Sequence, residues 1–429
     1  MKSPYSLEQL VPYIRQYSKF YRTHLKHLPL NSIELKDLPL INVTDYWAGS
    51  NDLQNWPVLT GFVDDALVFK TVGSTSQGKL SVYSRDEWHA MVSTFGQSLA
   101  TQLNHGDRVA NLFFSGDLYA SFLFTHHSLA HVGKSICEFP FTGQVELDGL
   151  AEAIARHRIN VLAGVPAQLL RFAAYLSQQR QVLSGVETLL YAGESLFAGQ
   201  LAIFTDVFPN ARIASIGYAS VDAGLIGASD RGCALGEHRV FERHTLLEII
   251  DELTGEVIEE CDRTGRLVVT NLTRRLMPLL RYPVGDSACW REPFATPRRK
   301  FALKGRSADS QRIRVGVLSL FPSEISEIVQ RIADSDQWQL LIEHTGYKDI
   351  LSMKWVPEPN QQNIEPMLRA LQEALVIQYP GIDDLSRDGL LELRVLSCAV
   401  TDLSLHPRSG KQPRILDLRV YDAPSPEPE

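Results

Sequence analysis

The sequence predicts an α/β protein in which a large N-terminal α/β domain with a β-rich subdomain precedes a small α+β domain. Short apolar runs alternate with amphipathic stretches from about residue 66 to residue 216, a pattern typical of a largely parallel sheet with helices between its strands. From residue 237 to about residue 305, strand-like runs follow one another with little helix between them. Helical and strand-like segments alternate again in the C-terminal part.

The N-terminal part begins with residues 6–28, where Leu10, Ile14 and Phe20 recur at helical spacing. Four later apolar runs are predicted to be buried strands, and five amphipathic stretches are predicted to be helices. The strands are expected at 109–114, 161–165, 188–192 and 213–216, and the helices at 85–103, 117–131, 147–158, 166–180 and 196–207.

A linker is expected at residues 305–309, where the pattern of the preceding strands ends. The predicted domains are therefore residues 1–305 and residues 306–429. The β-rich subdomain is expected to contain strands at 246–250, 267–270 and 279–282. The C-terminal domain is expected to contain helices at 322–333 and 361–378 and strands near 338–343, 350–356 and 391–397.

The composition predicts a soluble cytoplasmic protein. Of the 429 residues, 44% are hydrophobic and 21% are charged. A net charge of −8 argues against nucleic-acid binding, and no apolar run approaches the ~18 residues that a membrane span needs. The five cysteines are scattered and odd in number, which indicates a reducing compartment, and the N-terminus does not read as a signal peptide.

Three of the cysteines and one histidine could in principle bind zinc: Cys233, His238, Cys261 and Cys289. Their spacing matches no tight zinc-binding pattern, so structural roles are favoured.

The loop 71–79 is rich in hydroxyl groups and glycine, and it is expected to precede a helix. Ser74, Ser76 and Gly78 can present hydroxyl and N–H groups to phosphate oxygens, with Lys79 as a cation. The glycine spacing is not that of nucleotide triphosphatases. An ordinary flexible surface loop is the alternative.

Four polar residues, after predicted strands or in the predicted linker, can hold parts of a nucleotide. Tyr218 and Asp222 follow the strand 213–216, at the edge where α/β proteins bind ligands; Tyr218 can pack on a flat base and Asp222 can hold Mg²⁺. Asp286 can accept both hydroxyl groups of a ribose, and Arg306 can bond a ribose or a phosphate. Ordinary turns, a capping aspartate and a solvated arginine are the alternatives.

Near the C-terminus, the run 406–414 carries Arg408, Lys411 and Arg414 around a glycine. Three cations in a turn suit an anion such as phosphate, although a basic surface turn is the simpler interpretation.

The motifs occur in an order that resembles the adenylate-forming superfamily, and the most similar branch is that of the phenylacetate–CoA ligases. The resemblance covers nearly the whole chain. It includes Phe20-Tyr21-Arg22, the segment from Gly305-Arg306 through 320–324, and 414–417. It implies the adenylate-forming enzyme fold, in which the small C-terminal domain is a mobile lid that pivots between an adenylation step and a thiol-accepting step.

The resemblance also implies roles for individual residues. The phosphate loop would contain Ser74, Ser76, Gly78 and Lys79; Tyr218 would flank adenine; Asp286 and Arg306 would hold the ribose; Asp222 would take the place of a Mg²⁺-directing glutamate; and Lys411 would reach the acyl carboxylate and the α-phosphate. Gly193 and Glu194 are expected to contribute to nucleotide binding, and their turn is expected to border the acid. Phe113, Phe114 and Phe139 can line a slot for an aromatic acid, or they can equally belong to the sheet core.

The predicted function is ATP-dependent activation of a carboxylic acid, with an aromatic acid favoured, followed by transfer to CoA or another thiol. ATP and Mg²⁺ are the expected cofactors, together with CoA where a thioester forms. Two alternatives stay open: adenylation without CoA transfer in a biosynthetic pathway, for example of a phenazine-type acid or with a carrier protein as acceptor, and nucleotide binding without turnover. A homodimer is compatible with each of these functions.

Replacing Lys411 by alanine is expected to abolish acid-dependent exchange of pyrophosphate into ATP, while the protein still folds and binds ATP. Negative charge grows where the lysine would lie, and the loss of one such group typically costs roughly 10²–10³ in rate. Exchange assays and calorimetric titration with ATP check this, and unchanged exchange in the variant would refute the role assigned to Lys411.

Overall fold

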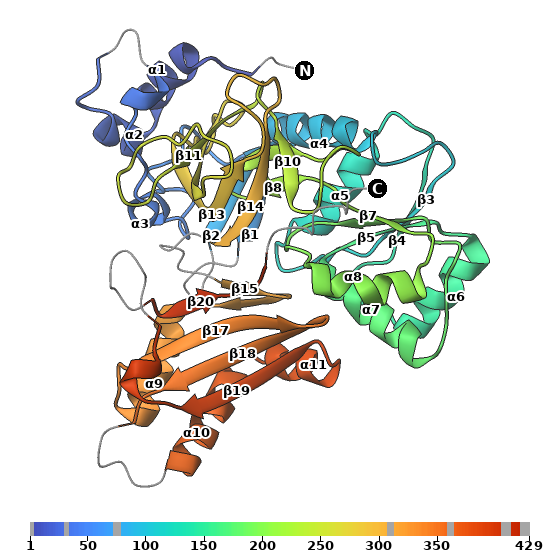
Figure 1. Ribbon diagram of the computed structural model, residues 1–429. Helices are drawn as coiled ribbons and strands as arrows, with labels where there is room; N and C mark the ends of the chain where they lie inside the picture. The colour runs from blue at the N-terminus through green and yellow to red at the C-terminus, as the bar shows by residue number, and fades with distance from the viewer. Residues whose placement is uncertain are drawn as a thin grey trace. The chain divides into compact units, whose positions relative to one another are not determined.

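The computed structural model describes residues 4–29, 34–71, 79–306, 313–357, 364–404 and 413–420 (Figure 1). They form two compact units. Unit 1 comprises Met1–Gly164, Thr188–Gly193 and Arg212–Ser307, and unit 2 comprises Val165–Glu187, Glu194–Ala211 and Ala308–Glu429. The grouping places two segments before residue 212 with the C-terminal part, so the predicted division into 1–305 and 306–429 stays a prediction.

Unit 1 contains the predicted parallel sheet, which confirms the α/β class. Its five strands are all parallel and run in the order β4-β3-β5-β6-β7. They are β3 (Arg108–Asn111), β4 (Cys137–Pro140), β5 (Val161–Gly164), β6 (Thr188–Tyr191) and β7 (Arg212–Ser215). The central strands β5 and β6 are buried along their whole length, as expected for a sheet covered on both faces.

A second, seven-stranded antiparallel sheet of unit 1 has the order β11-β12-β13-β14-β10-β9-β8. Its strands are β8 (Tyr218–Ser220), β9 (Gly224–Ala228), β10 (Glu237–Val240), β11 (Thr245–Ile250), β12 (Gly265–Asn271), β13 (Tyr282–Trp290) and β14 (Lys300–Arg306). Arg306 pairs with Asp286 at the end of β14, so the prediction that Gly305 and Arg306 belong to a linker is wrong. Backbone pairing with β13 holds this segment in the sheet.

A two-stranded sheet pairs β1 (Ala66–Thr71) with β2 (Lys79–Ser84). The segment after the predicted phosphate loop is therefore a strand, where a helix was expected. The helix α4 (Arg85–Leu99) begins only after Ser84, whose hydroxyl accepts a hydrogen bond from the Glu87 amide while the Glu87 carboxylate accepts one from the Ser84 amide.

The N-terminal stretch 6–28, whose apolar residues recur at helical spacing, forms two helices, α1 (Leu7–Tyr17) and α2 (Lys19–His24). Ser18 separates them in an extended conformation, and its hydroxyl both caps α2 and donates to the Pro57 carbonyl at 3.0 Å. The other helices of unit 1 are η1 (Leu35–Asp37), α3 (Val43–Trp47), α5 (Ser121–Leu129) and α6 (Leu147–His157).

Unit 2 contains a hairpin and a four-stranded sheet of order β19-β18-β17-β20. The strands are β15 (Ile313–Val315), β16 (Leu318–Leu320), β17 (Trp338–Thr345), β18 (Lys348–Trp355), β19 (Leu391–Ser397) and β20 (Ile415–Asp417). The helices are α7 (Pro166–Gln178), α8 (Ala198–Val207), α9 (Pro322–Ala333), α10 (Ile364–Gln378), α11 (Gly381–Arg387) and η2 (Val400–Asp402). No helix within the described ranges is both long and apolar enough to cross a membrane.

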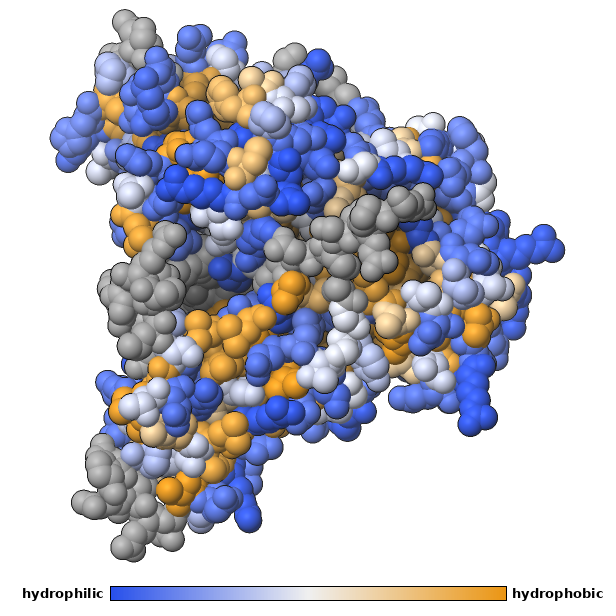
Figure 2. All heavy atoms as spheres, viewed as in Figure 1, coloured by the Kyte–Doolittle hydropathy of each residue, from blue (hydrophilic) through white to orange (hydrophobic). Residues whose placement is uncertain are grey.

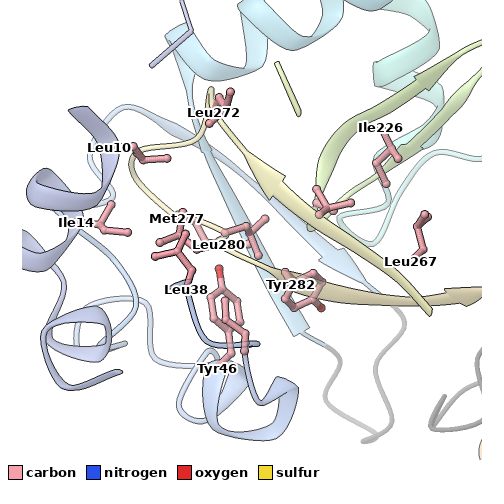
Figure 3. Close-up of a cluster of buried hydrophobic side chains, with 14 of the residues drawn as sticks. Leu10, Ile14, Leu38, Tyr46, Ile226, Leu267, Leu272, Met277, Leu280 and Tyr282 are labelled. Atoms are coloured by element: carbon pink, nitrogen blue, oxygen red, sulfur yellow. The ribbon is translucent and has the colours of Figure 1, made fainter. Parts of the chain in front are cut away.

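A buried cluster joins the N-terminal helices to the antiparallel sheet of unit 1 (Figure 3). Leu10 and Ile14 of α1 contribute to it, as do Met277 and Leu280 from the segment before β13. The apolar residues of α1 therefore fix the position of the segment that leads into β13.

On the face shown in Figure 2, hydrophilic residues predominate and hydrophobic ones form smaller groups.

The prediction of a strand at 279–282 is wrong for its first three residues, because β13 begins at Tyr282. Arg281 adopts a positive φ of 44°, which takes the chain out of the extended conformation. Its buried guanidinium contacts both carboxylate oxygens of Glu248, at 2.9 and 3.1 Å, and donates to the Leu38 carbonyl at 2.7 Å. A bidentate ion pair therefore fixes the point at which β13 starts.

Substitution Arg281→Met is expected to destabilise the protein by about 3–5 kcal/mol, because it leaves the Glu248 carboxylate buried without its partner. Urea denaturation measures the effect. The double variant Glu248→Met/Arg281→Met should recover part of the loss, and Arg156→Ala, which removes an exposed pair with Glu152, should cost less than ~1 kcal/mol. A loss in Arg281→Met no larger than in Arg156→Ala would contradict the prediction.

Candidate active site

Tyr218, Asp286 and Arg306 form one bonded chain across the antiparallel sheet. The Tyr218 hydroxyl donates to Asp286 Oδ2, and Arg306 Nη1 lies 2.9 Å from Asp286 Oδ1. All three side chains are partly buried. Burial, and then the charge of Asp286, raise the pKa of Tyr218 well above 10, so the phenol stays protonated and remains a donor. The structure thus brings together three residues that the sequence proposed separately.

Asp222 lies in the turn between β8 and β9, and three donors hold its carboxylate. Oδ1 accepts from the Ser220 hydroxyl and from the Ala223 amide at 2.9 Å, and Oδ2 accepts from the Tyr282 hydroxyl at 2.8 Å. The charges of Asp222 and Asp286 both act on Tyr218. The two carboxylates are therefore parts of one local electrostatic environment.

Trp47 and Lys79 extend this environment from other parts of the chain. The Trp47 indole N–H donates to the Tyr282 hydroxyl at 3.0 Å, and Lys79 Nζ lies 5.4 Å from the centre of the Trp47 ring. Lys79 is the first residue of β2. Lys79, at the end of the predicted phosphate loop, therefore contacts Trp47, and Trp47 in turn bonds Tyr282, the residue that donates to Asp222.

The buried Arg274 fixes the main chain around Asp222. Its guanidinium donates to the carbonyls of Asp222 and Val82, and it lies 3.8 Å from the centre of the Tyr83 ring. The Tyr83 hydroxyl in turn donates to the Val221 carbonyl at 2.8 Å. One buried cation therefore ties the Asp222 turn to β2.

No family model matches this chain, whereas individual proteins do. A phenylacetate–coenzyme A ligase from Pseudomonas putida is 25% identical over 317 residues, which cover 71% of this chain and 69% of that protein. A second one, from Aromatoleum evansii, is 37% identical over 117 residues, 27% of this chain and 26% of that protein. The indoleacetate–lysine synthetase of Pseudomonas savastanoi is 30% identical over 43% of this chain and 42% of its own length.

Among solved structures, a 2-hydroxyisobutyryl-CoA ligase in complex with 2-HIB-AMP and CoA has the same fold. It superposes with a TM-score of 0.71 at 16% sequence identity, covering 96% of this chain and 88% of that one. The chain is thus similar in sequence to the phenylacetate–coenzyme A ligases and has the fold of this 2-hydroxyisobutyryl-CoA ligase. The resemblance read from the motifs is thereby confirmed.

Tyr218 directly follows a tightly packed turn. Gly217 has a φ of 128°, and a Cβ at this position would lie 2.9 Å from both the Gly227 carbonyl oxygen and the Phe95 ring. The Ser215 hydroxyl accepts from the Gly217 amide at 3.0 Å and is 3.0 Å from Nε2 of the buried His238. His238 thus holds the turn through Ser215. Within the residues that the structure describes, no group of three or more histidine, cysteine, aspartate or glutamate side chains could hold a metal ion.

Gly193 and Glu194 follow β6. Gly193 has a φ of 88°. The last residue of β6, Tyr191, accepts a hydrogen bond through its carbonyl from the amide of Ile216, at 2.9 Å. The end of β6 therefore lies next to the turn at Gly217. Glu194 belongs to unit 2, where its buried carboxylate lies 3.5 Å from Arg314 and burial raises its pKa. Its nucleotide-binding role stays a prediction.

The three phenylalanines proposed for an acid slot have different surroundings. Phe113 is 2% exposed, and the Phe114 ring lies against Gly143, where a Cβ would come within 2.8 Å of it. Phe139 stacks on His157 at 5.5 Å and lies beneath the Arg108 guanidinium. Their assignment to the substrate stays a prediction, as does the alternative that they are core.

Four of the predicted site residues lie outside the described residues: Ser74, Ser76, Gly78 and Lys411. Sequence reasoning in turn overlooked Trp47, Arg274 and the contact made by Tyr282. Tyr282 stands within a motif that was singled out and could have been found there. Trp47 is 235 residues from its partner and gave no signal.

The stability of the protein is expected to fall as the pH drops from about 6.5 towards 4, partly because of His238. Burial lowers the pKa of His238 in the folded protein from 6.5 to about 4. The contribution of His238 to the free energy of unfolding is therefore complete above the pKa of the unfolded chain and is lost as the pH falls towards 4. Over 1.5 pH units below 6.5 the loss is about 2 kcal/mol. His238→Gln should flatten the pH dependence in urea denaturation, while the exposed-site variant His27→Gln should follow the wild type.

Proposed function

We propose that this protein uses ATP to activate a carboxylic acid as an acyl-adenylate, releasing pyrophosphate. The observation that carries the proposal is the state of Asp286, whose two carboxylate oxygens are each held by one partner, Tyr218 and Arg306. A carboxylate has about four acceptor positions, so one position on each oxygen is left by the contacts of the described residues. Two acceptors on one rigid group suit the two adjacent hydroxyl groups of a ribose.

Arg306 and Tyr218 add to this ribose site. The guanidinium fixes the orientation of the Asp286 carboxylate, and it has further N–H donors for oxygen atoms of the nucleotide. The Tyr218 ring lies at the start of β8, 5.8 Å from the His238 ring between ring centres. A ring in this position can lie against the flat face of adenine.

Asp222 fits the role of a magnesium ligand. Three donors occupy three of its four acceptor positions, which leaves one position on Oδ2 among the described contacts. Mg²⁺ typically takes one or two protein carboxylates together with phosphate oxygens and water. When bound, Mg²⁺ would neutralise charge on the phosphates of ATP.

In the reaction, a carboxylate oxygen of the acid attacks the α-phosphorus, and the bond from that phosphorus to the pyrophosphate oxygen breaks. Catalysis of such a step depends on positioning and on stabilising charge, without a nucleophilic side chain. We assign Lys79 to the phosphates, together with Ser74, Ser76 and Gly78, and Lys411 to the acyl carboxylate and α-phosphate. These assignments come from the motif order.

We further propose an aromatic acid as substrate and CoA as acceptor, supported by the phenylacetate–coenzyme A ligases among the relatives. The similarity to an indoleacetate–lysine synthetase favours a second candidate, in which the adenylate passes to an amine. A carrier-protein thiol is the third acceptor to test.

A panel of aryl acids, assayed for acid-dependent pyrophosphate release, tests the proposal. Acyl-adenylate should be trapped as a hydroxamate by hydroxylamine without CoA, and addition of CoA should divert it to the thioester. Trapping with no thioester would direct the search to amines and carrier proteins. If the protein bound ATP but released no pyrophosphate in the presence of any acid of the panel, the proposal would be overturned in favour of a nucleotide-binding protein.

Asp286→Ala is expected to lower kcat/KM for ATP by roughly 10- to 150-fold, because charged hydrogen bonds to the ribose are worth about 1.5–3 kcal/mol. ATP-dependent exchange kinetics measure the change. Asp52→Ala, which removes an exposed aspartate bonded to Asn55, is the matched control and should behave as wild type. An Asp286→Ala variant with normal kinetics for ATP would show that the ribose lies elsewhere.

A further inference from the structure

We propose that Tyr282 is a positioning residue for Asp222, and that Trp47 orients its hydroxyl. The inference rests on the proposed function and goes beyond it, because it assigns the geometry of the carboxylate to two side chains that are not themselves expected to touch the nucleotide. Tyr282 is 3% exposed and Trp47 is 6% exposed.

The hydrogen bonds define a directional relay. The Trp47 N–H can only donate, so the Tyr282 oxygen accepts from it at 3.0 Å. The phenol then has its own proton for Asp222 Oδ2, at 2.8 Å. Trp47 thus decides where the Tyr282 proton points.

The Tyr282 ring is fixed by packing independently of its hydroxyl. The Tyr46 ring lies 5.6 Å away between centres, and the two labelled side chains lie side by side in Figure 3. Trp47 itself stacks on Trp56 at 5.4 Å. Replacing Tyr282 by phenylalanine therefore keeps this packing and removes only the bond to Asp222.

The relay determines which acceptor position of Asp222 remains open. Ser220 and the Ala223 amide take Oδ1, and Tyr282 takes one side of Oδ2. The remaining position of Oδ2 then points in one direction only. We infer that a divalent cation bound there uses this single oxygen, and that losing the phenol lets the carboxylate turn away from it.

Binding of Mn²⁺ in the presence of α,β-methylene-ATP, followed by electron paramagnetic resonance, tests the inference without turnover. Tyr282→Phe should bind Mn²⁺ roughly 10- to 100-fold more weakly, the usual effect of removing a hydrogen bond to a metal ligand. The Mg²⁺ concentration for half-maximal pyrophosphate exchange should rise in parallel. Tyr21→Phe is the matched control, since it removes a buried tyrosine hydroxyl that bonds the Pro278 carbonyl and leaves Asp222 untouched.

Trp47→Phe provides a second, independent variant. It should weaken Mn²⁺ binding in the same direction, and adding it to Tyr282→Phe should cause no further loss, because both act through one hydroxyl. Unchanged Mn²⁺ affinity in Tyr282→Phe, or losses in the two variants that simply add, would overturn the positioning role. Absence of Mn²⁺ binding in the wild type would instead overturn the proposed function.

Discussion

The starting point of β13 is the constraint on which the candidate site depends. The buried pair of Arg281 and Glu248 holds the turn that precedes this strand, so that Tyr282 pairs with Val269 and Asp286 with Arg306. Tyr282 and Asp286 both come from β13: Tyr282 donates to Asp222, and Asp286 pairs with Arg306. Because successive side chains of a strand point to opposite faces, a shift of one residue at the start of β13 would turn the Tyr282 side chain to the other face of the sheet.

The site uses neutral donors to control two carboxylates. Tyr218 donates to Asp286 and Tyr282 donates to Asp222, and burial raises the pKa of both phenols well above 10. Each tyrosine therefore remains a donor at neutral pH. An arginine in the place of Tyr282 would cancel the charge of Asp222 and weaken its use as a metal ligand, whereas a phenol orients the carboxylate and leaves its charge intact.

The sequence allowed the parallel sheet to be predicted, because apolar periodicity is a local pattern, and it allowed roles to be proposed for single positions. The strands β5 and β6 and the helix α9 lie where the apolar periodicity put them. Arg306 was placed in a linker because its strand partner Asp286 is 20 residues away and pairing cannot be read from a local pattern. Trp47 was missed for the same reason over a longer separation, since only the folded core brings α3 to β13.

All the described contacts of Asp222 and Asp286 come from unit 1. The residues proposed for the ribose and the metal are therefore held in position by their own sheet, whichever way the remainder of the chain is arranged. Lys411, in contrast, lies in the predicted C-terminal domain, and its role was inferred from motif order alone. Nucleotide binding and chemistry should then separate by mutation: changes around β13 act on affinity for ATP and metal, and a change at Lys411 acts on the chemical step while binding is retained.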